Sequence, residues 1–152
     1  MRIGCCAGLD SIAVIEQAGY DYIEPAVGTV MPERPESEFE AVLKQVEGRT
    51  IRPEAWNCLM PGDIKLTGPG VDSYRIERYL LTAFERIAKL GGEIVVFGSG
   101  GARNVPDGFS MLEARRQILD FLTLAGDVAE EKSLTIAIEP LNRKESNIIN
   151  SV

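Results

Sequence analysis

Five short apolar runs alternate with longer amphipathic segments along the 152-residue chain. Most runs are bounded by glycine or proline, which is typical of buried strands. The runs read RIGCCAG from Arg2, YIEPAV from Tyr22, RPEAWNCLMP from Arg52, EIVVFG from Glu93 and LTIAIEP from Leu134. We therefore predict five strands.

Helical patterns fill the segments between these runs. Residues 10–18, 37–47 and 73–90 each stop before a glycine, as helices commonly do. The stretch from Ser110 to Glu113 is a capping box, which predicts a further helix from Ser110. Strands that alternate with helices indicate an α/β fold with a parallel sheet.

Two architectures fit this order, a doubly wound open sheet and part of a (β/α)8 barrel. A complete barrel takes about 250 residues, so five strands in this length fit the first part of one. Asn147 is suited to cap a helix starting at Ile148, and the chain stops soon after it. We predict one domain over residues 1–152, a partial TIM barrel of about five βα units that stops in the helix after strand five.

The composition excludes several kinds of partner and of catalytic site. The net charge of −7 argues against nucleic acid as a partner, because binding phosphates requires a basic patch. No apolar run approaches the ~20 residues of a membrane span, and three cysteines with no signal-peptide pattern favour the cytoplasm. The chain has no histidine, which excludes a Ser-His-Asp triad, a Cys-His pair and a His-rich zinc site.

Glu139 is the main candidate for chemistry. It ends an apolar run and is followed by Pro140, which cannot continue a strand ladder. A carboxylate at such a tip requires a metal or an ion pair, and Arg143 and Lys144 are the candidate ion-pair partners. Glu24 and Asn57 occupy similar positions on strands two and three. Three polar groups on one rim favour a binding site.

The loop FGSGGARNVPDG follows strand four. It lacks the third glycine of a dinucleotide motif, so we interpret its glycines as allowing the backbone to bend over a pocket. Arg103 in this loop either contacts a substrate oxygen or phosphate or is a solvated side chain. We expect Cys5, Cys6 and Cys58 to be small buried residues, and Trp56 to be either core or a pocket wall.

Three stretches together, NCLMPGDIKLTGP, VVFGSGGARNVPDGF and IEPLNRKESNIINSV, resemble the xylose isomerase-like TIM-barrel superfamily, in its sugar phosphate isomerase/epimerase group. The resemblance covers essentially the whole chain, as strands one to five. It implies that Glu139 binds a divalent metal and acts as an acid/base carboxylate. It also implies that Glu145 contacts substrate hydroxyls, and we add Asn57 and Arg103 as predicted substrate contacts.

The implied activity is metal-dependent isomerisation or epimerisation of a sugar or sugar phosphate, by proton transfer through an ene-diolate. The implied metal is Mn²⁺, with Mg²⁺ or Co²⁺ as substitutes. The family's other ligands, an aspartate, a histidine and a glutamate, come from later strands. We therefore expect this chain to be incomplete, inactive alone and a homo-oligomer through its open sheet edges.

The alternative is a non-catalytic half-barrel that serves in assembly. The acidic composition and the missing histidines disfavour the DNA endonuclease branch of the same superfamily.

Overall fold

The computed structural model describes residues 1–151, and all five predicted strands are present within them. Each strand is shorter than its apolar run, because the flanking residues leave the sheet for loops. The strands are β1 (Gly4–Cys6), β2 (Tyr22–Glu24), β3 (Ala55–Trp56), β4 (Ile94–Phe97) and β5 (Thr135–Ile138).

The strands form a parallel array in chain order. β1 pairs with β2, and β3 pairs with β4, which pairs with β5. Backbone hydrogen bonds join the two groups: Val27 N donates to Asn57 O at 2.8 Å, and Asn57 N donates to Pro25 O at 3.0 Å. The order β1 to β5 is that of a partial TIM barrel, as predicted. The sheet is not closed, because no described strand pairs with the outer side of β1 or β5.

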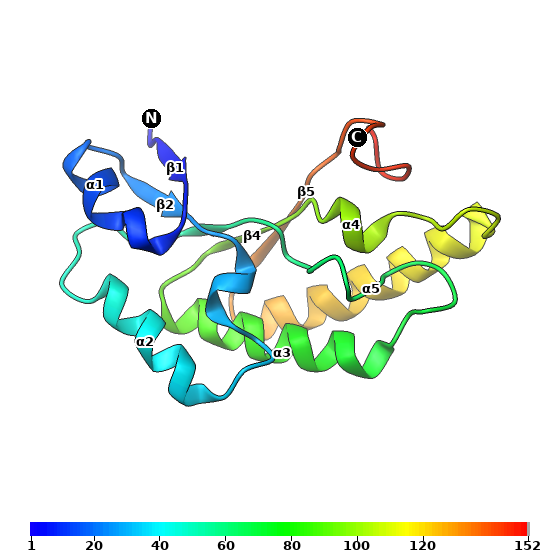
Figure 1. Cartoon of the computed structure of the whole chain (residues 1–152), viewed down its shortest axis with the longest axis horizontal. Coiled ribbons are helices and arrows are strands. Elements are labelled where there is room, and N and C mark those ends of the chain that lie inside the picture. The colour runs from blue at the N-terminus through cyan, green and yellow to red at the C-terminus, as the bar shows by residue number, and fades with distance from the viewer. Residues whose placement is uncertain (152) are drawn as a thin grey trace.

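Helices follow the strands, and α2, α3 and α5 lie together on one side of them (Figure 1). None of the helices within residues 1–151 combines the length and apolar character of a membrane span. The sequence did not predict α4. The α-helices are α1 (Ile12–Gln17), α2 (Glu36–Val46), α3 (Ser73–Lys89), α4 (Gly100–Arg103) and α5 (Met111–Glu131), and two short 3-10 helices span Leu9–Ser11 and Val27–Val30.

The helix ends follow the sequence signals. Ser110 Oγ accepts from Glu113 N at 3.3 Å, which confirms the capping interaction at the start of α5. At the start of α3, Asp72 Oδ1 accepts from Arg75 N at 3.0 Å. α3 ends before Gly91, whose φ of +79° is the left-handed conformation that glycine adopts without strain.

The core lies between the strands and the helices. Trp56 is fully buried and donates from Nε1 to Pro53 O at 2.8 Å, so it belongs to the core and is not a pocket wall. Phe97 of β4 packs on Phe121 of α5, with ring centroids 5.0 Å apart. These contacts fix the strand ends, from which the candidate site is built.

The predicted helix after strand five is absent from residues 139–151. Asn147 does not cap a helix. Its Oδ1 accepts from Val105 N and its Nδ2 donates to Val105 O, both at 2.9 Å, so the side chain pairs with another loop. Ile149 has a φ of +56°, which a right-handed helix does not contain. Val152 lies outside the described residues.

Candidate functional site

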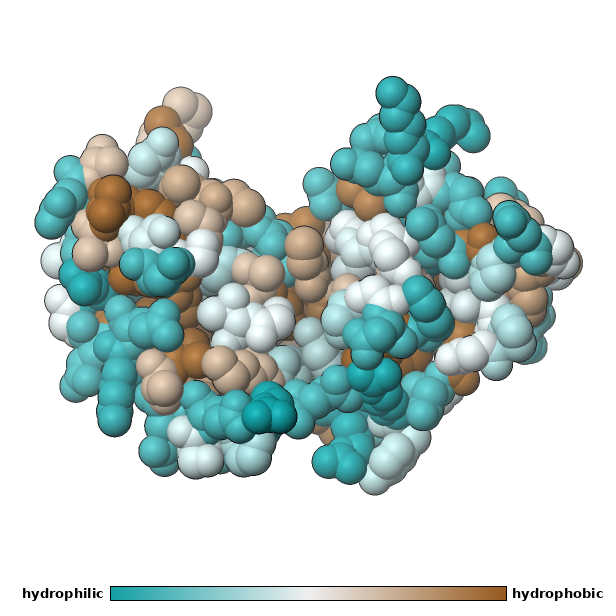
Figure 2. Space-filling model, in the orientation of Figure 1, coloured by the Kyte–Doolittle hydropathy of each residue, from teal (hydrophilic) through white to brown (hydrophobic). Residues whose placement is uncertain are grey.

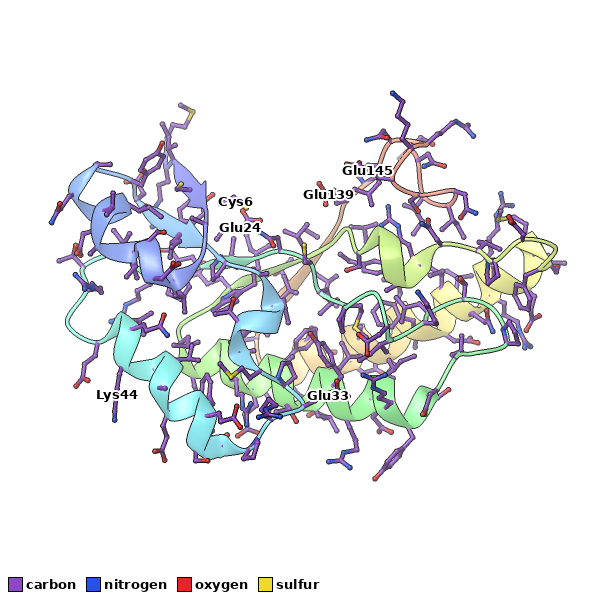
Figure 3. All side chains as sticks on the ribbon, in the orientation of Figure 1. Cys6, Glu24, Glu33, Lys44, Glu139 and Glu145 are labelled. Atoms are coloured by element: carbon purple, nitrogen blue, oxygen red, sulfur yellow. The ribbon has the colours of Figure 1, made fainter. Side chains whose placement is uncertain are left out.

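The carboxyl ends of the strands carry the predicted polar side chains. Figure 2 shows this face hollowed between two raised parts of the molecule, and we call this hollow the notch. In Figure 3, Cys6 and Glu24 lie on one side of the notch, and Glu139 and Glu145 lie on the other. Parallel strands bring their carboxyl ends to one edge, which is why residues distant in sequence meet here.

Glu139 follows β5, and its backbone N donates to Phe97 O at 3.1 Å, which aligns it with the end of β4. Its side chain is exposed. The alternative of an ion pair with Arg143 or Lys144 is wrong, because no ion pair within residues 1–151 includes Glu139. The carboxylate is therefore available to an outside ligand.

Gly98 makes room for that carboxylate. A Cβ at Gly98 would stand 2.2 Å from Glu139 Oε2, far inside van der Waals contact. The glycine therefore allows this position of the Glu139 carboxylate, in addition to any bend of the loop. Sequence reasoning missed this role, because nothing in the glycine-rich run indicates which residue lies above it.

Asn57 links three strand ends. Its Nδ2 donates to Glu24 O at 3.3 Å and lies 2.9 Å from Cys6 Sγ. This contact brings the Asn57 amide to the backbone of Glu24, whereas convergence of the two side chains on a ligand stays a prediction. The amide donor is directed at the protein, so a substrate contact would use its carbonyl oxygen.

The expectation that the three cysteines are buried is wrong. Cys6 and Cys58 are exposed and Cys5 is half-buried. All three are free thiols. Desolvation raises the pKa of the Cys58 thiol, and the charges of Cys6, Glu139 and Glu24 raise it further. Cys58 also adopts a φ of +52°, which is uncommon for a residue with a side chain.

Arg103 is not solvated. It is fully buried, and its guanidinium donates to the carbonyl oxygens of Phe97 at 3.1 Å, Glu139 at 3.0 Å and Ile149 at 3.2 Å. Its Nε also donates to Ser146 Oγ at 3.4 Å. Arg103 therefore holds the segment after β5 against the end of β4. Its donors are directed at backbone atoms, which gives it a positioning role in place of the expected substrate contact.

Glu145 is exposed on the same segment as Glu139. Its Oε2 accepts from Asn142 Nδ2 at 2.5 Å, and its carbonyl oxygen accepts from Asn104 Nδ2 at 3.3 Å. The bond from Asn104 holds the Glu145 backbone beside the residues that follow α4. The carboxylate keeps further lone pairs for a ligand hydroxyl.

The described residues do not form a complete metal site. No group of three or more histidine, cysteine, aspartate or glutamate side chains within residues 1–151 is placed to hold an ion. A glutamate carboxylate is a suitable ligand for Mn²⁺ or Mg²⁺, so Glu139 qualifies as a single ligand. The described residues alone therefore do not supply three such side chains for one ion.

Comparison with solved structures gives the same fold in several proteins, two of which are named as epimerases. A crystal structure of D-psicose 3-epimerase in the presence of D-fructose matches with a TM-score of 0.79 and 16% identity, over 99% of this chain and 56% of that chain. The 3-keto-D-glucoside 4-epimerase of E. coli matches with a TM-score of 0.77 and 19% identity, over 99% and 60%. The IOLI protein with a binding zinc atom matches with a TM-score of 0.62 and 20% identity, over 91% and 51%.

At these identities the likenesses establish the fold alone, and the chain spans between 51% and 60% of the length of these three proteins. None of the curated proteins compared matches the sequence. The family model described as xylose isomerase-like TIM barrel matches residues 12–152, most of the chain, so the protein belongs to the xylose isomerase-like TIM barrel family.

Proposed function

We propose that this chain carries the acid/base glutamate of a metal-dependent sugar or sugar-phosphate isomerase or epimerase. The observation that carries the proposal is the Glu139 carboxylate, which lies at the strand ends without an ion pair, above a glycine that leaves room for it. The epimerase neighbours support the reaction class. We also propose that the substrate is a sugar or sugar phosphate, that a divalent metal is bound, and that the protein is cytoplasmic.

In this proposal Glu139 accepts a proton from the carbon next to a sugar carbonyl, which leaves an ene-diolate, and the proton returns to a neighbouring carbon or to the other face. A bound divalent metal, with Mn²⁺ as the first candidate and Mg²⁺ or Co²⁺ as alternatives, would lower the cost of that charge. Arg103 keeps Glu139 in place through the Glu139 carbonyl, and Glu145 accepts hydrogen bonds from substrate hydroxyls.

The alternative function, a non-catalytic half-barrel used in assembly, rests on the open edges of β1 and β5. This alternative requires no metal or substrate at Glu139, whereas the first proposal does. Measuring whether the full-length protein binds a divalent metal therefore distinguishes the two functions.

The test uses Glu139→Gln and Glu145→Gln in the full-length protein, with Mn²⁺ calorimetry and turnover of free ketoses and ketose phosphates. We expect Glu139→Gln to lose metal affinity and to lower turnover by about 10²–10⁴-fold. Glu145→Gln mainly raises KM. Residues 1–152 alone should show no turnover with Mn²⁺, because no group of three or more candidate ligands is present within residues 1–151. Metal binding by Glu139→Gln at the wild-type affinity would show that the ligand assignment is wrong.

A further inference from the structure

A polar hollow of about 630 Å³ lies beside Glu145, between the loop after β3, the residues after α4 and the segment after β5. It is separate from the strand ends that hold Glu139 and Asn57. Its lining includes Lys65, Arg143 and Lys144, together with Asp107 and Glu145.

Neutral polar side chains fix the walls of this hollow. The Asn147 amide pairs with both backbone groups of Val105, and Thr67 Oγ1 donates to Asn104 O at 2.8 Å. Asn104 Nδ2 donates to the carbonyl oxygen of Glu145. These hydrogen bonds connect all three segments, so the shape of the hollow does not depend on its charged side chains.

The cations around the hollow are not used in ion pairs. No ion pair within residues 1–151 includes Lys65, Arg143 or Lys144, although Asp107 and Glu145 line the same hollow. Lys65 Nζ donates to Gly62 O and Gly101 O and keeps one of its three donors. The lining carries three positive and two negative side chains, so its formal charge is positive although the whole chain has a net charge of −7.

We propose that this hollow binds the phosphate of a phosphorylated sugar, with the reacting carbons at Glu139. The inference rests on the proposed function and specifies its substrate class. A phosphate monoester carries close to two negative charges, which lysine binds as a point charge and arginine through two parallel hydrogen bonds. Glu145 lines the hollow, and Figure 3 shows it on the same side of the notch as Glu139, on the segment that follows β5.

The test titrates inorganic phosphate, D-fructose 6-phosphate and D-fructose into the chain and follows the backbone amide signals of residues 143–147 by NMR. We compare the wild type with the double variant Arg143→Gln/Lys144→Gln. Lys44→Gln is the matched control, since Lys44 is an exposed lysine on α2, far from Glu145 in Figure 3. All the changed side chains are exposed, so the variants should fold, which circular dichroism checks.

We expect the wild type and Lys44→Gln to bind the ketose phosphate more tightly than D-fructose, and the double variant to bind it at least about tenfold more weakly. Equal affinity in the double variant and the wild type would overturn the proposal. The proposal would also be overturned if the chain bound inorganic phosphate as tightly as the ketose phosphate, because the hollow would then be a general anion site. The proposed function fails separately if Glu139→Gln leaves turnover of the full-length protein unchanged while the chain still binds the ketose phosphate.

Discussion

The carboxylate of Glu139 lies directly over Gly98, where a Cβ would stand 2.2 Å from Oε2. The two residues end neighbouring parallel strands, β5 and β4. The carboxylate of Glu139, which is proposed to transfer the proton, therefore occupies space that is free only because Gly98 has no side chain.

The first prediction concerns Gly98→Ala. The added methyl displaces the carboxylate of Glu139, and we expect turnover in the full-length protein to fall on the order of 10²-fold. Stability should change little, because the displaced atoms are the far end of a flexible side chain. Gly126→Ala in α5 is the control, since nothing lies within 4 Å of its Cβ. It should leave turnover intact and stabilise the chain by about 0.5–1 kcal/mol. Full turnover in Gly98→Ala would contradict the steric role.

The second prediction concerns Arg103. We expect Arg103→Met to reduce the free energy of unfolding by roughly 3 kcal/mol, because buried carbonyl oxygens lose their donors. Arg103→Lys should restore little, since an ammonium cannot reproduce the planar fork of donors. Urea unfolding measures both changes. Arg115→Met, at an exposed position of α5, is the control and should lie within about 0.5 kcal/mol of the wild type.

The third prediction concerns acid stability. Hydrogen bonds from Arg75 lower the pKa of Glu33 and of Asp63 below their ordinary values of 4.5 and 3.8. The stabilisation is therefore complete above the unfolded pKa values and is lost as pH falls through the lower folded values. We expect Arg75→Gln to flatten the loss of stability below about pH 4.5. Urea unfolding over a pH series measures the slope, and Arg115→Gln should keep the wild-type slope.

The fourth prediction concerns assembly. In β5, Ile136 and Ala137 are half-buried and Ile138 is 48% exposed, whereas Val95 and Phe97 in β4 are fully buried. An apolar hollow of about 560 Å³ runs along β5 and α5. An open strand edge beside an apolar face favours pairing with another strand, and a second copy of this chain offers the same edge. We therefore predict a two-fold dimer of residues 1–152.

Light scattering coupled to size exclusion measures its mass. We expect twice the 16.6 kDa of one chain. Ile138→Lys should shift the dimer toward monomer, whereas Leu112→Lys, at an exposed position near the start of α5, should not. A monodisperse monomer with cooperative unfolding would show that the open sheet is stable by itself.

The sequence alone determined the order and type of the main elements. Short apolar runs, helical spacing and stop glycines such as Gly91 are local signals, and they predicted five strands and four of the five α-helices. Glu139 was placed at a strand end because Pro140 stops the ladder, which is also a local effect. The parallel order followed from the alternation of strands and helices.

The tertiary structure decided which groups meet. The guanidinium of Arg103 meets backbone carbonyl oxygens at the end of β4 and on the segment after β5, and the local sequence around Arg103 does not indicate that the second segment lies there. Asn147 pairs with Val105 in place of capping a helix for the same reason. The close approach of the Glu139 carboxylate to Gly98 likewise depends on a side chain that follows another strand. Such contacts form between residues far apart in the chain, so the local pattern cannot specify them.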